Sequence, residues 1–337
     1  MKQERIQNPN LVERAAIEAK IAAGNHVILQ FDKPVYSSEL LKKINNLCGE
    51  LGKNLEVRFY GHYGDKFDAS YLRFLPDVAA LSIDCLSEAT NLSALNDLAN
   101  LHHLSLGVYR LNEPDFLKSL KLQNLERLAL CETAKSSFDL LPLQACGKLT
   151  EFFLDGHTKN IDCLTSLPAL QALSLGQISK RQRLEFVSKI QNLKRLRLIL
   201  GGRTNISEIQ HSTLEELEVL RVLGFSNLEN LNAFPSLRSL AIEDQIRLEK
   251  ISFTAASQNI QSVRIFNCKT LRDLEGLNHL TNLKSIQIGM TAVEIDSVLQ
   301  QRLPASLKTF GFYTGKKKEN ARARARLDAI GYQERER

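Results

Sequence analysis

The chain has 337 residues, of which 43% are hydrophobic and 24% charged, so it is long enough for two globular domains or one extended array of repeats. The first ten residues, MKQERIQNPN, have no apolar core, so we do not expect a signal peptide. No stretch of about 18 apolar residues occurs later, so we do not expect a membrane-spanning helix. Six cysteines without a CxxC pair favour a reduced, cytoplasmic protein.

The amino-terminal region carries signals for a helix, a strand and a second helix. The stretch NPNLVERAAIEAKIAAGN is typical of a helix that begins near Pro9. VILQF (27–31) predicts a strand, and Ser37 is placed to cap a helix that runs to about Leu51. We therefore expect residues 1–53 to form an amino-terminal cap.

A motif of the form LxxLxL then recurs at intervals of 21 to 24 residues. Of the 36 template sites, 35 are apolar, whereas the residue between the second and third sites is apolar in only three repeats. Such alternation with period two indicates a short strand in every repeat. The second template site falls at twelve positions: Val57, Leu81, Leu104, Leu128, Phe152, Leu173, Leu196, Leu217, Leu240, Val263, Ile286 and Phe310.

This pattern resembles the leucine-rich-repeat family, most plainly in LRDLEGLNHLTNLKSIQIGMT (271–291), and the resemblance covers residues 54–314. It implies an α/β fold, a curved horseshoe solenoid with a parallel concave β-sheet of about 12–13 short strands. The family usually has asparagine at the ninth repeat position, where this chain has residues such as Thr133, His157 and Cys268. That departure implies loosely matched turns between repeats.

The carboxyl end is basic and predicted to be helical. ENARARARLDAIGYQ is typical of a helix that ends before Gly331. Residues 316–337 contain eight Lys/Arg against four Asp/Glu, a local charge of +4 within the total of +6. We expect residues 315–337 to form a capping helix followed by a basic tail.

Side chains between the core positions of each strand should face the concave surface. In NLKRLRLIL (192–200) and the next repeat, this alternation predicts that the two arginines lie beside two glutamates and that two apolar residues are neighbours. These charged side chains either pair with one another across the strands or orient a partner. The predicted partner-binding residues on these two strands are Arg195, Arg197, Ile199, Glu216, Glu218 and Leu220.

Other strands add large groups to the same predicted surface. Phe153 stands between Glu151 and Asp155, and Phe266 stands next to Arg264. Aromatic and arginine side chains are common anchors of protein interfaces, so we include these five residues among the partner-binding candidates. Tyr60 and Tyr313 occupy terminal repeats, where contact with a cap is an alternative to binding of a partner.

Nucleic-acid binding and catalysis receive less support from the sequence. The predicted concave positions carry five arginines and seven acids, a net charge of −2, whereas duplex binding needs a continuous positive surface. GFYTGKKK (311–318) has three residues between its glycines where a phosphate loop needs four. The histidines and cysteines lack metal-ligand spacing, so we expect no metal and no cofactor. Cys131 remains a weak candidate for a reactive thiol.

These observations favour a non-catalytic module that binds a protein partner on its concave face. An immunity or inhibitor protein and a host-directed effector are both compatible with that activity, and we expect a bacterial protein that is a monomer when alone. Two alternatives stay open: nucleic-acid association through the basic carboxyl-terminal tail, and an enzyme that uses Cys131 or concave carboxylates.

Overall fold

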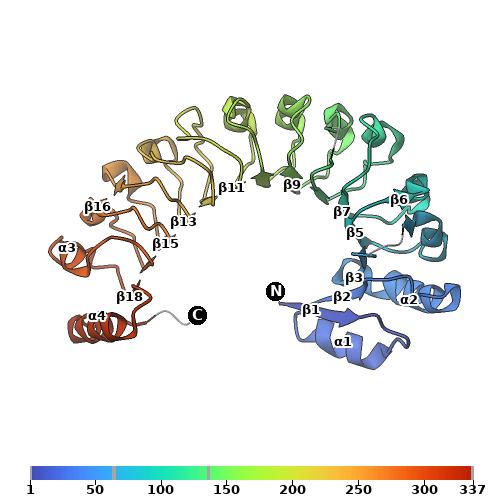
Figure 1. Cartoon of the computed structure of the whole chain (residues 1–337), viewed down its shortest axis with the longest axis horizontal. Helices are drawn as coiled ribbons and strands as arrows, with labels where there is room; N and C mark the ends of the chain where they lie inside the picture. Colours follow the sequence, from blue (N-terminus) through green and yellow to red (C-terminus); the bar gives the residue numbers. More distant parts are fainter. Residues whose placement is uncertain (1, 63–65, 135–136, 335–337) are drawn as a thin grey trace. The chain divides into compact units, whose positions relative to one another are not determined.

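The computed structural model describes residues 2–62, 66–134 and 137–334. The chain divides into two compact units, Met1–Leu170 and Gln171–Arg337 (Figure 1). Each unit consists of successive turns of a solenoid in which a short strand alternates with an outer segment. The fold class predicted from the sequence, a leucine-rich-repeat solenoid with a parallel sheet, is confirmed.

In the first unit, the described residues form a parallel sheet in the order β1-β2-β3-β5-β7-β8-β9. Its strands are β1 (Gln3–Gln7), β2 (His26–Phe31), β3 (Leu55–Tyr60), β5 (Ala80–Leu86), β7 (His103–Val108), β8 (Arg127–Leu130) and β9 (Glu151–Asp155). The α-helices are α1 (Arg14–Ala22) and α2 (Ser38–Leu51), and β4 (Phe67–Asp68) pairs with β6 (Ala89–Thr90). Short 3₁₀ helices cover Gly52–Asn54, Ala69–Phe74, Leu92–Asp97, Phe116–Ser119, Leu141–Ala145 and Ile161–Ser166.

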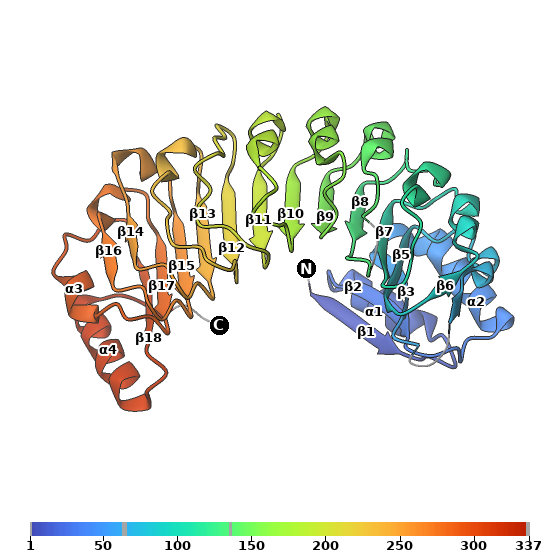
Figure 2. The same ribbon diagram turned by 45° about the horizontal axis from the view of Figure 1, so that its top comes forward.

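The second unit repeats this arrangement in the order β10-β11-β12-β13-β15-β17-β18, with the strands side by side in Figure 2. They are β10 (Ala172–Gly176), β11 (Arg195–Ile199), β12 (Glu216–Leu220), β13 (Ser239–Glu243), β15 (Ser262–Phe266), β17 (Ser285–Gly289) and β18 (Thr309–Tyr313). An outer pair joins β14 (Lys250–Ser252) to β16 (Asp273–Glu275). The helices are α3 (Ile295–Leu299) and α4 (Lys317–Ile330), and 3₁₀ turns cover Glu185–Lys189, Leu231–Ala233, Ala255–Ser257 and Leu277–His279.

The LxxLxL motif explains both the strands and the core. Each of the twelve predicted positions lies in a strand, from Val57 in β3 to Phe310 in β18. In β11 and the turn before it, Leu193, Leu196 and Leu198 are at most 3% exposed. Full burial of such a side chain contributes about 1.5–3 kcal/mol, so repetition of the motif accounts for the stacking of the repeats.

The amino-terminal elements agree with the sequence except at the start. The Oγ atom of Ser37 accepts a 3.1 Å hydrogen bond from the backbone N–H of Leu40, as expected for the cap of α2. The helix predicted to begin near Pro9 begins instead at Arg14. The residues before it form β1, a strand that the sequence did not predict. This pairing continues one residue past β1, where the N–H of Asn8 donates to the carbonyl of Gln30 at 2.8 Å.

The turns between repeats are better matched than the missing asparagines implied. In the second unit, the residue after a strand adopts positive φ and donates its N–H to the last carbonyl of the next strand. Examples are Gln177 to Ile199 and Leu200 to Leu220, both at 2.9 Å. At the ninth position, the side-chain Nε2 of Gln245 donates to the backbone carbonyl of Val219 at 3.1 Å. Other side chains therefore bond the backbone where the family has asparagine.

Helix α4 closes the end of the second unit. Ala323 and Leu327 are buried against the last repeat, and Gly331 ends the helix with φ of +98°. Beyond it, Gln333 forms an isolated parallel bridge with Thr309 of β18. Among the helices that the structure describes, none is long and apolar enough to cross a bilayer.

Candidate protein-binding surface

The sheet face of β11 and β12 carries two ion pairs in strand register. Arg195 is the register partner of Glu216, and Arg197 is the partner of Glu218. In both pairs the arginine Nε donates to the carboxylate at 2.7 Å. The four side chains are 30–44% exposed, so these are surface ion pairs that contribute little to stability. The predicted adjacency of the basic and acidic strands is confirmed.

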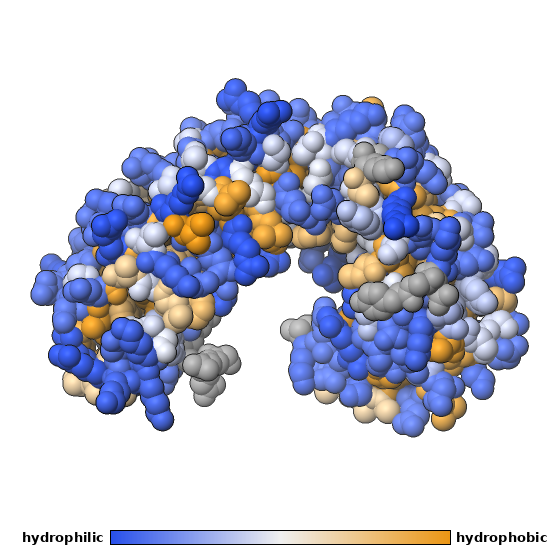
Figure 3. Space-filling view, in the orientation of Figure 1, coloured by the Kyte–Doolittle hydropathy of each residue, from blue (hydrophilic) through white to orange (hydrophobic). Residues whose placement is uncertain are grey.

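An apolar pair lies beside these charges on the same two strands. Ile199 and Leu220 are register partners, and both are half-buried. Just past the strand ends, Leu200, Leu223 and Ile246 are 40%, 67% and 60% exposed. Figure 3 shows hydrophobic residues gathered near β11 to β13 on the face that it displays.

The three residues past the strand ends were missed by the sequence analysis. Leu200 directly follows Ile199 and thus breaks the alternation, which was a visible signal. Its positive φ of +59° turns the chain out of the strand, so its side chain does not follow the pleat into the core.

Farther along the second unit, an aromatic ring lies flat on the sheet. The Phe266 ring is so close to Gly289 that an added Cβ there would meet ring atoms at 2.4 and 2.5 Å. The guanidinium of Arg264 lies 5.9 Å from the ring centroid and 3.5 Å from the Glu243 carboxylate. The ring therefore lies over Gly289 of β17, and the charge of Arg264 is paired with Glu243 of β13.

In the first unit, β9 carries the remaining three candidates. Glu151, Phe153 and Asp155 point to the same face because they alternate along the strand, and all three are half-buried. The register partner of Phe153 is Ala129, which has a small side chain. Glu151 pairs with Arg127 at 2.9 Å. Three of the eleven candidates lie in the first unit and eight in the second.

The amino-terminal part of the same sheet is bonded internally. The Arg58 Nε donates to Asp84 at 2.8 Å, the Tyr60 hydroxyl donates to Gln7 at 2.8 Å, and Arg58 lies 4.5 Å from the Tyr60 ring centroid. Tyr313 donates similarly to Glu334 at 3.1 Å. Tyr60 and Tyr313 therefore contact terminal segments of the chain.

The thiol of Cys131 lies between acidic groups. Burial raises the pKa of Cys131 to about 12, and the charges of Asp84 and Asp155 act in the same direction. A nucleophilic cysteine needs a lowered pKa, so this environment opposes activation of the thiol. Within the described residues, no group of three or more His, Cys, Asp or Glu is arranged to hold a metal ion.

Comparison with known proteins identifies the fold but no closer relative. No protein-family model matches the chain, and no curated protein matches it. An internalin (InlF) from Listeria monocytogenes is 18% identical with a TM-score of 0.54, covering 87% of this chain and 79% of the internalin. The Toll–Spätzle complex from Drosophila is 11% identical with a TM-score of 0.51; 93% of this chain matches 43% of that one, so this chain spans less than half its length. Internalins are leucine-rich-repeat proteins, and the likeness shows that fold.

Proposed function

We propose that this protein is a non-catalytic binding module that holds a protein partner on the exposed sheet faces of its repeats. The observation that carries the proposal is the apolar pair Ile199 and Leu220, set beside two charge pairs that already satisfy each other. Apolar groups with a neutralised polar surround are typical of interface anchors. The similar structure named for the Toll–Spätzle complex contains such a two-protein assembly, which supports the same kind of activity.

The proposal includes the finer expectations from the sequence. Residues 1–53 and 315–337 act as caps on repeats 54–314, and the protein is a bacterial, cytoplasmic monomer until it meets its partner. An inhibitor or immunity protein would use the sheet face to cover a toxin or enzyme, and an effector would use it to hold a host protein. Both roles need the same surface.

The test is capture of a partner by single variants. Leu220→Asp should reduce capture from the native cell at least about tenfold, because it places a charge at the centre of an apolar contact. Phe153→Ala should test the first unit separately. Leu141→Asp is the matched control, since Leu141 is 47% exposed at the start of an outer 3₁₀ helix. If the folded Leu220→Asp and Phe153→Ala proteins capture as much partner as the wild type, the proposed surface is wrong.

A further inference from the structure

The turns that follow the strands of the second unit lie along one edge of its sheet. The strands run parallel, so the chain leaves each of them at the same side (Figure 2). Neighbouring turns are bonded, since Gly202 forms a parallel bridge with Leu223 and donates its N–H to the Ile178 carbonyl at 3.2 Å. We call the four residues after each of β10, β11, β12, β13, β15 and β17 the strand-end edge: residues 177–180, 200–203, 221–224, 244–247, 267–270 and 290–293.

Three exposed aliphatic side chains lie on the strand-end edge. Leu200 is the first residue after β11, and Leu223 and Ile246 are the third residues after β12 and β13. Four large hydrophobic side chains are exposed in the described part of the second unit, and these are three of them. On the face that Figure 3 displays, hydrophobic residues lie among hydrophilic ones in this region. Such a concentration of exposed aliphatic groups on one edge indicates a surface that another body covers.

The strand-end edge is also positively charged. It carries one acid, Asp244, and five cations, Lys180, Arg203, Arg221, Arg247 and Lys269, which gives a net charge of +4. Arg221 is paired with Asp244 at 2.7 Å, and Arg203 with Glu208 at 2.9 Å. The other three cations are exposed, and none of them forms an ion pair within the described ranges of the chain. Three positive charges therefore face the solvent on this edge.

The cations flank the aliphatic side chains. Lys269 occupies the position after β15 that Leu223 and Ile246 occupy after β12 and β13, and Arg247 directly follows Ile246. Adjacent strands are about 4.8 Å apart, so these groups can touch one extended surface together. Aliphatic side chains between long basic ones match the boundary of an anionic bilayer. There the aliphatic groups enter the acyl region and the cations stay at the phosphates.

Shape and charge favour a bilayer over other occupants of this edge. A second copy of the chain would bring the same positive charge, which repels. A nucleic acid would neutralise the cations but would leave the aliphatic side chains in water. A folded protein must offer a fitted pocket to each protruding side chain, whereas lipid adapts its shape to all three.

We propose that the strand-end edge binds the surface of an anionic phospholipid bilayer. Its three aliphatic side chains insert at the level of the headgroups, and its three unpaired cations bind lipid phosphates. The attachment is peripheral and needs no membrane-spanning helix. This inference goes beyond the proposed function, because the edge and the sheet face are separate surfaces, and a bound bilayer leaves the sheet face open to a partner.

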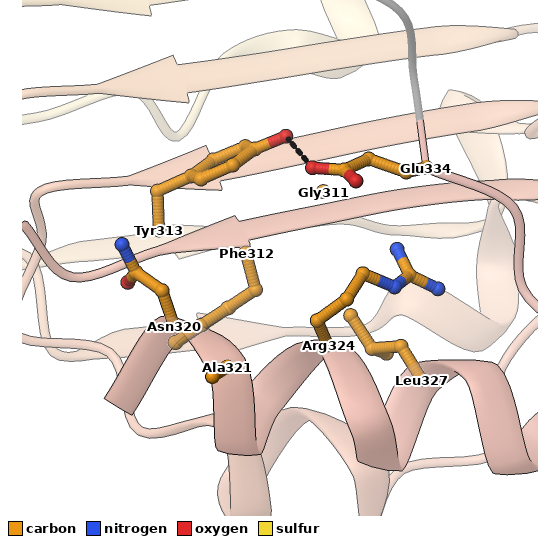
Figure 4. Close-up of a pocket in the computed structure, with 8 residues that line it drawn as sticks. All are labelled: Gly311, Phe312, Tyr313, Asn320, Ala321, Arg324, Leu327 and Glu334. Atoms are coloured by element: carbon orange, nitrogen blue, oxygen red, sulfur yellow. Dashed lines mark hydrogen bonds between the residues drawn. The ribbon is translucent and has the colours of Figure 1, made fainter. Parts of the chain in front are cut away.

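Helix α4 supplies a control position away from the strand-end edge. Figure 4 shows α4 beside β18, across a cavity of about 270 Å³ at which Arg324 donates to the Phe310 carbonyl at 3.0 Å. After the helix, Gln333 bridges Thr309 at the start of β18, so α4 ends toward the opposite edge of the sheet. Ile330, in the last turn of α4, is 56% exposed and is thus similar in exposure to Ile246.

The first experiment uses an introduced fluorophore, because the chain has no tryptophan. Leu223→Trp is mixed with vesicles of phosphatidylcholine that contain about 30% phosphatidylglycerol. Its emission should shift to shorter wavelengths, and brominated lipid should quench it, because the indole enters the bilayer boundary. Ile330→Trp is the matched control, and its emission should not change when vesicles are added.

The second experiment measures co-sedimentation of the full chain with the same vesicles. Arg247→Gln combined with Lys269→Gln should weaken binding at least about tenfold, because two charges are removed from the membrane surface. Lys284→Gln combined with Lys308→Gln is the matched control. These two lysines are exposed and directly precede β17 and β18, so the control removes equal charge from the opposite edge. It should change binding by less than about twofold.

Lack of binding to the anionic vesicles by the wild type would overturn the proposal. Equal weakening by the two charge variants, or an equal emission shift for Ile330→Trp, would overturn it as well. A labelled oligothymidine that binds more tightly than the vesicles, with an affinity that Leu223→Ser leaves unchanged, would assign the edge to nucleic acid instead. None of these results bears on capture of a partner by the sheet face around Leu220.

Discussion

Arg197 Nε donates a 2.7 Å hydrogen bond to the Glu218 carboxylate across the parallel strands β11 and β12. The arginine side chain is 39% exposed and the glutamate side chain 30% exposed. Water therefore screens the attraction, and the pair should contribute about 0.2–1 kcal/mol to the free energy of unfolding. The geometry is well defined although its energetic contribution is small.

A double-mutant cycle measures that contribution. The single variants Arg197→Ala and Glu218→Ala, with the double variant, should give a coupling free energy below about 1 kcal/mol in urea unfolding, and the coupling should shrink in 1 M salt. Arg58 and Asp84 provide the comparison, because their paired side chains are only 17% and 16% exposed. A larger coupling for Arg197 and Glu218 than for that pair would contradict our description of a surface ion pair.

The sequence predicted this relationship because repetition fixes register. Once the interval between repeats is known, the neighbour of each strand residue follows from the same position in the next repeat. The pairing of Arg195 with Glu216 follows from the sequence in this way, and the strand register agrees with it. The twelve strands share one apolar pattern, so the local preference of each segment for a strand agrees with its place in the repeated fold.

What the sequence did not predict lies outside that repetition. Strand β1 has the sequence QERIQ, in which the core-side residue Glu4 pairs with Lys20 of α1 instead of entering an apolar core. No alternation of apolar and polar residues marks such a strand. The exposed Leu223 and Ile246 were missed for a related reason, because backbone turns after the strands direct them outward.

Acid should destabilise the first unit through His103. Burial, followed by the charge of Arg127, lowers the pKa of His103 from 6.5 to about 4. Between these values the unfolded chain binds a proton that the folded protein does not, so the contribution of His103 to stability is present above pH 6.5 and is lost as the pH falls toward 4. Because the ring is partly exposed, we expect a loss of roughly 1 kcal/mol between pH 7 and pH 5.

Urea unfolding of the wild type and His103→Gln at both pH values tests this expectation. The variant lacks the titrating ring, so its free energy of unfolding should fall by roughly 1 kcal/mol less than that of the wild type over the same pH range. An identical decrease in the two proteins would show that other groups carry the whole pH dependence.

The cysteines should differ strongly in reactivity. Cys85 is exposed, whereas Cys131 is half-buried and burial raises its pKa to about 12. Because only the thiolate reacts, a disulfide reagent at pH 8 should modify Cys85 first and Cys131 at least about 100-fold more slowly in the folded protein. Cys85→Ser should remove the fast phase. Fast modification of Cys131 in that variant would contradict this expectation and favour the enzymatic alternative.

Two adjacent glycines should respond differently to the same substitution. Gly201 has φ of +67°, and a Cβ added there would lie 2.5 Å from the carbonyl oxygen and 2.8 Å from the nitrogen of Ile178. Gly202 has no such constraint, since the nearest atom to an added Cβ is the carbonyl oxygen of Leu223 at 3.8 Å. Gly201→Ala must therefore move backbone in the neighbouring repeat, at a cost of about 2–3 kcal/mol.

Gly202→Ala should change the free energy of unfolding by less than about 1 kcal/mol, because alanine fits the space at Gly202 and restricts the unfolded chain. Thermal and urea unfolding of both variants give the comparison directly. If the two substitutions lower the free energy of unfolding equally, Gly201 does not lie as close to Ile178 as described. The described stacking of this turn on the preceding repeat would then be wrong as well. That stacking sets the position of Leu200 and of β11, so the proposed binding surface depends on the same contact.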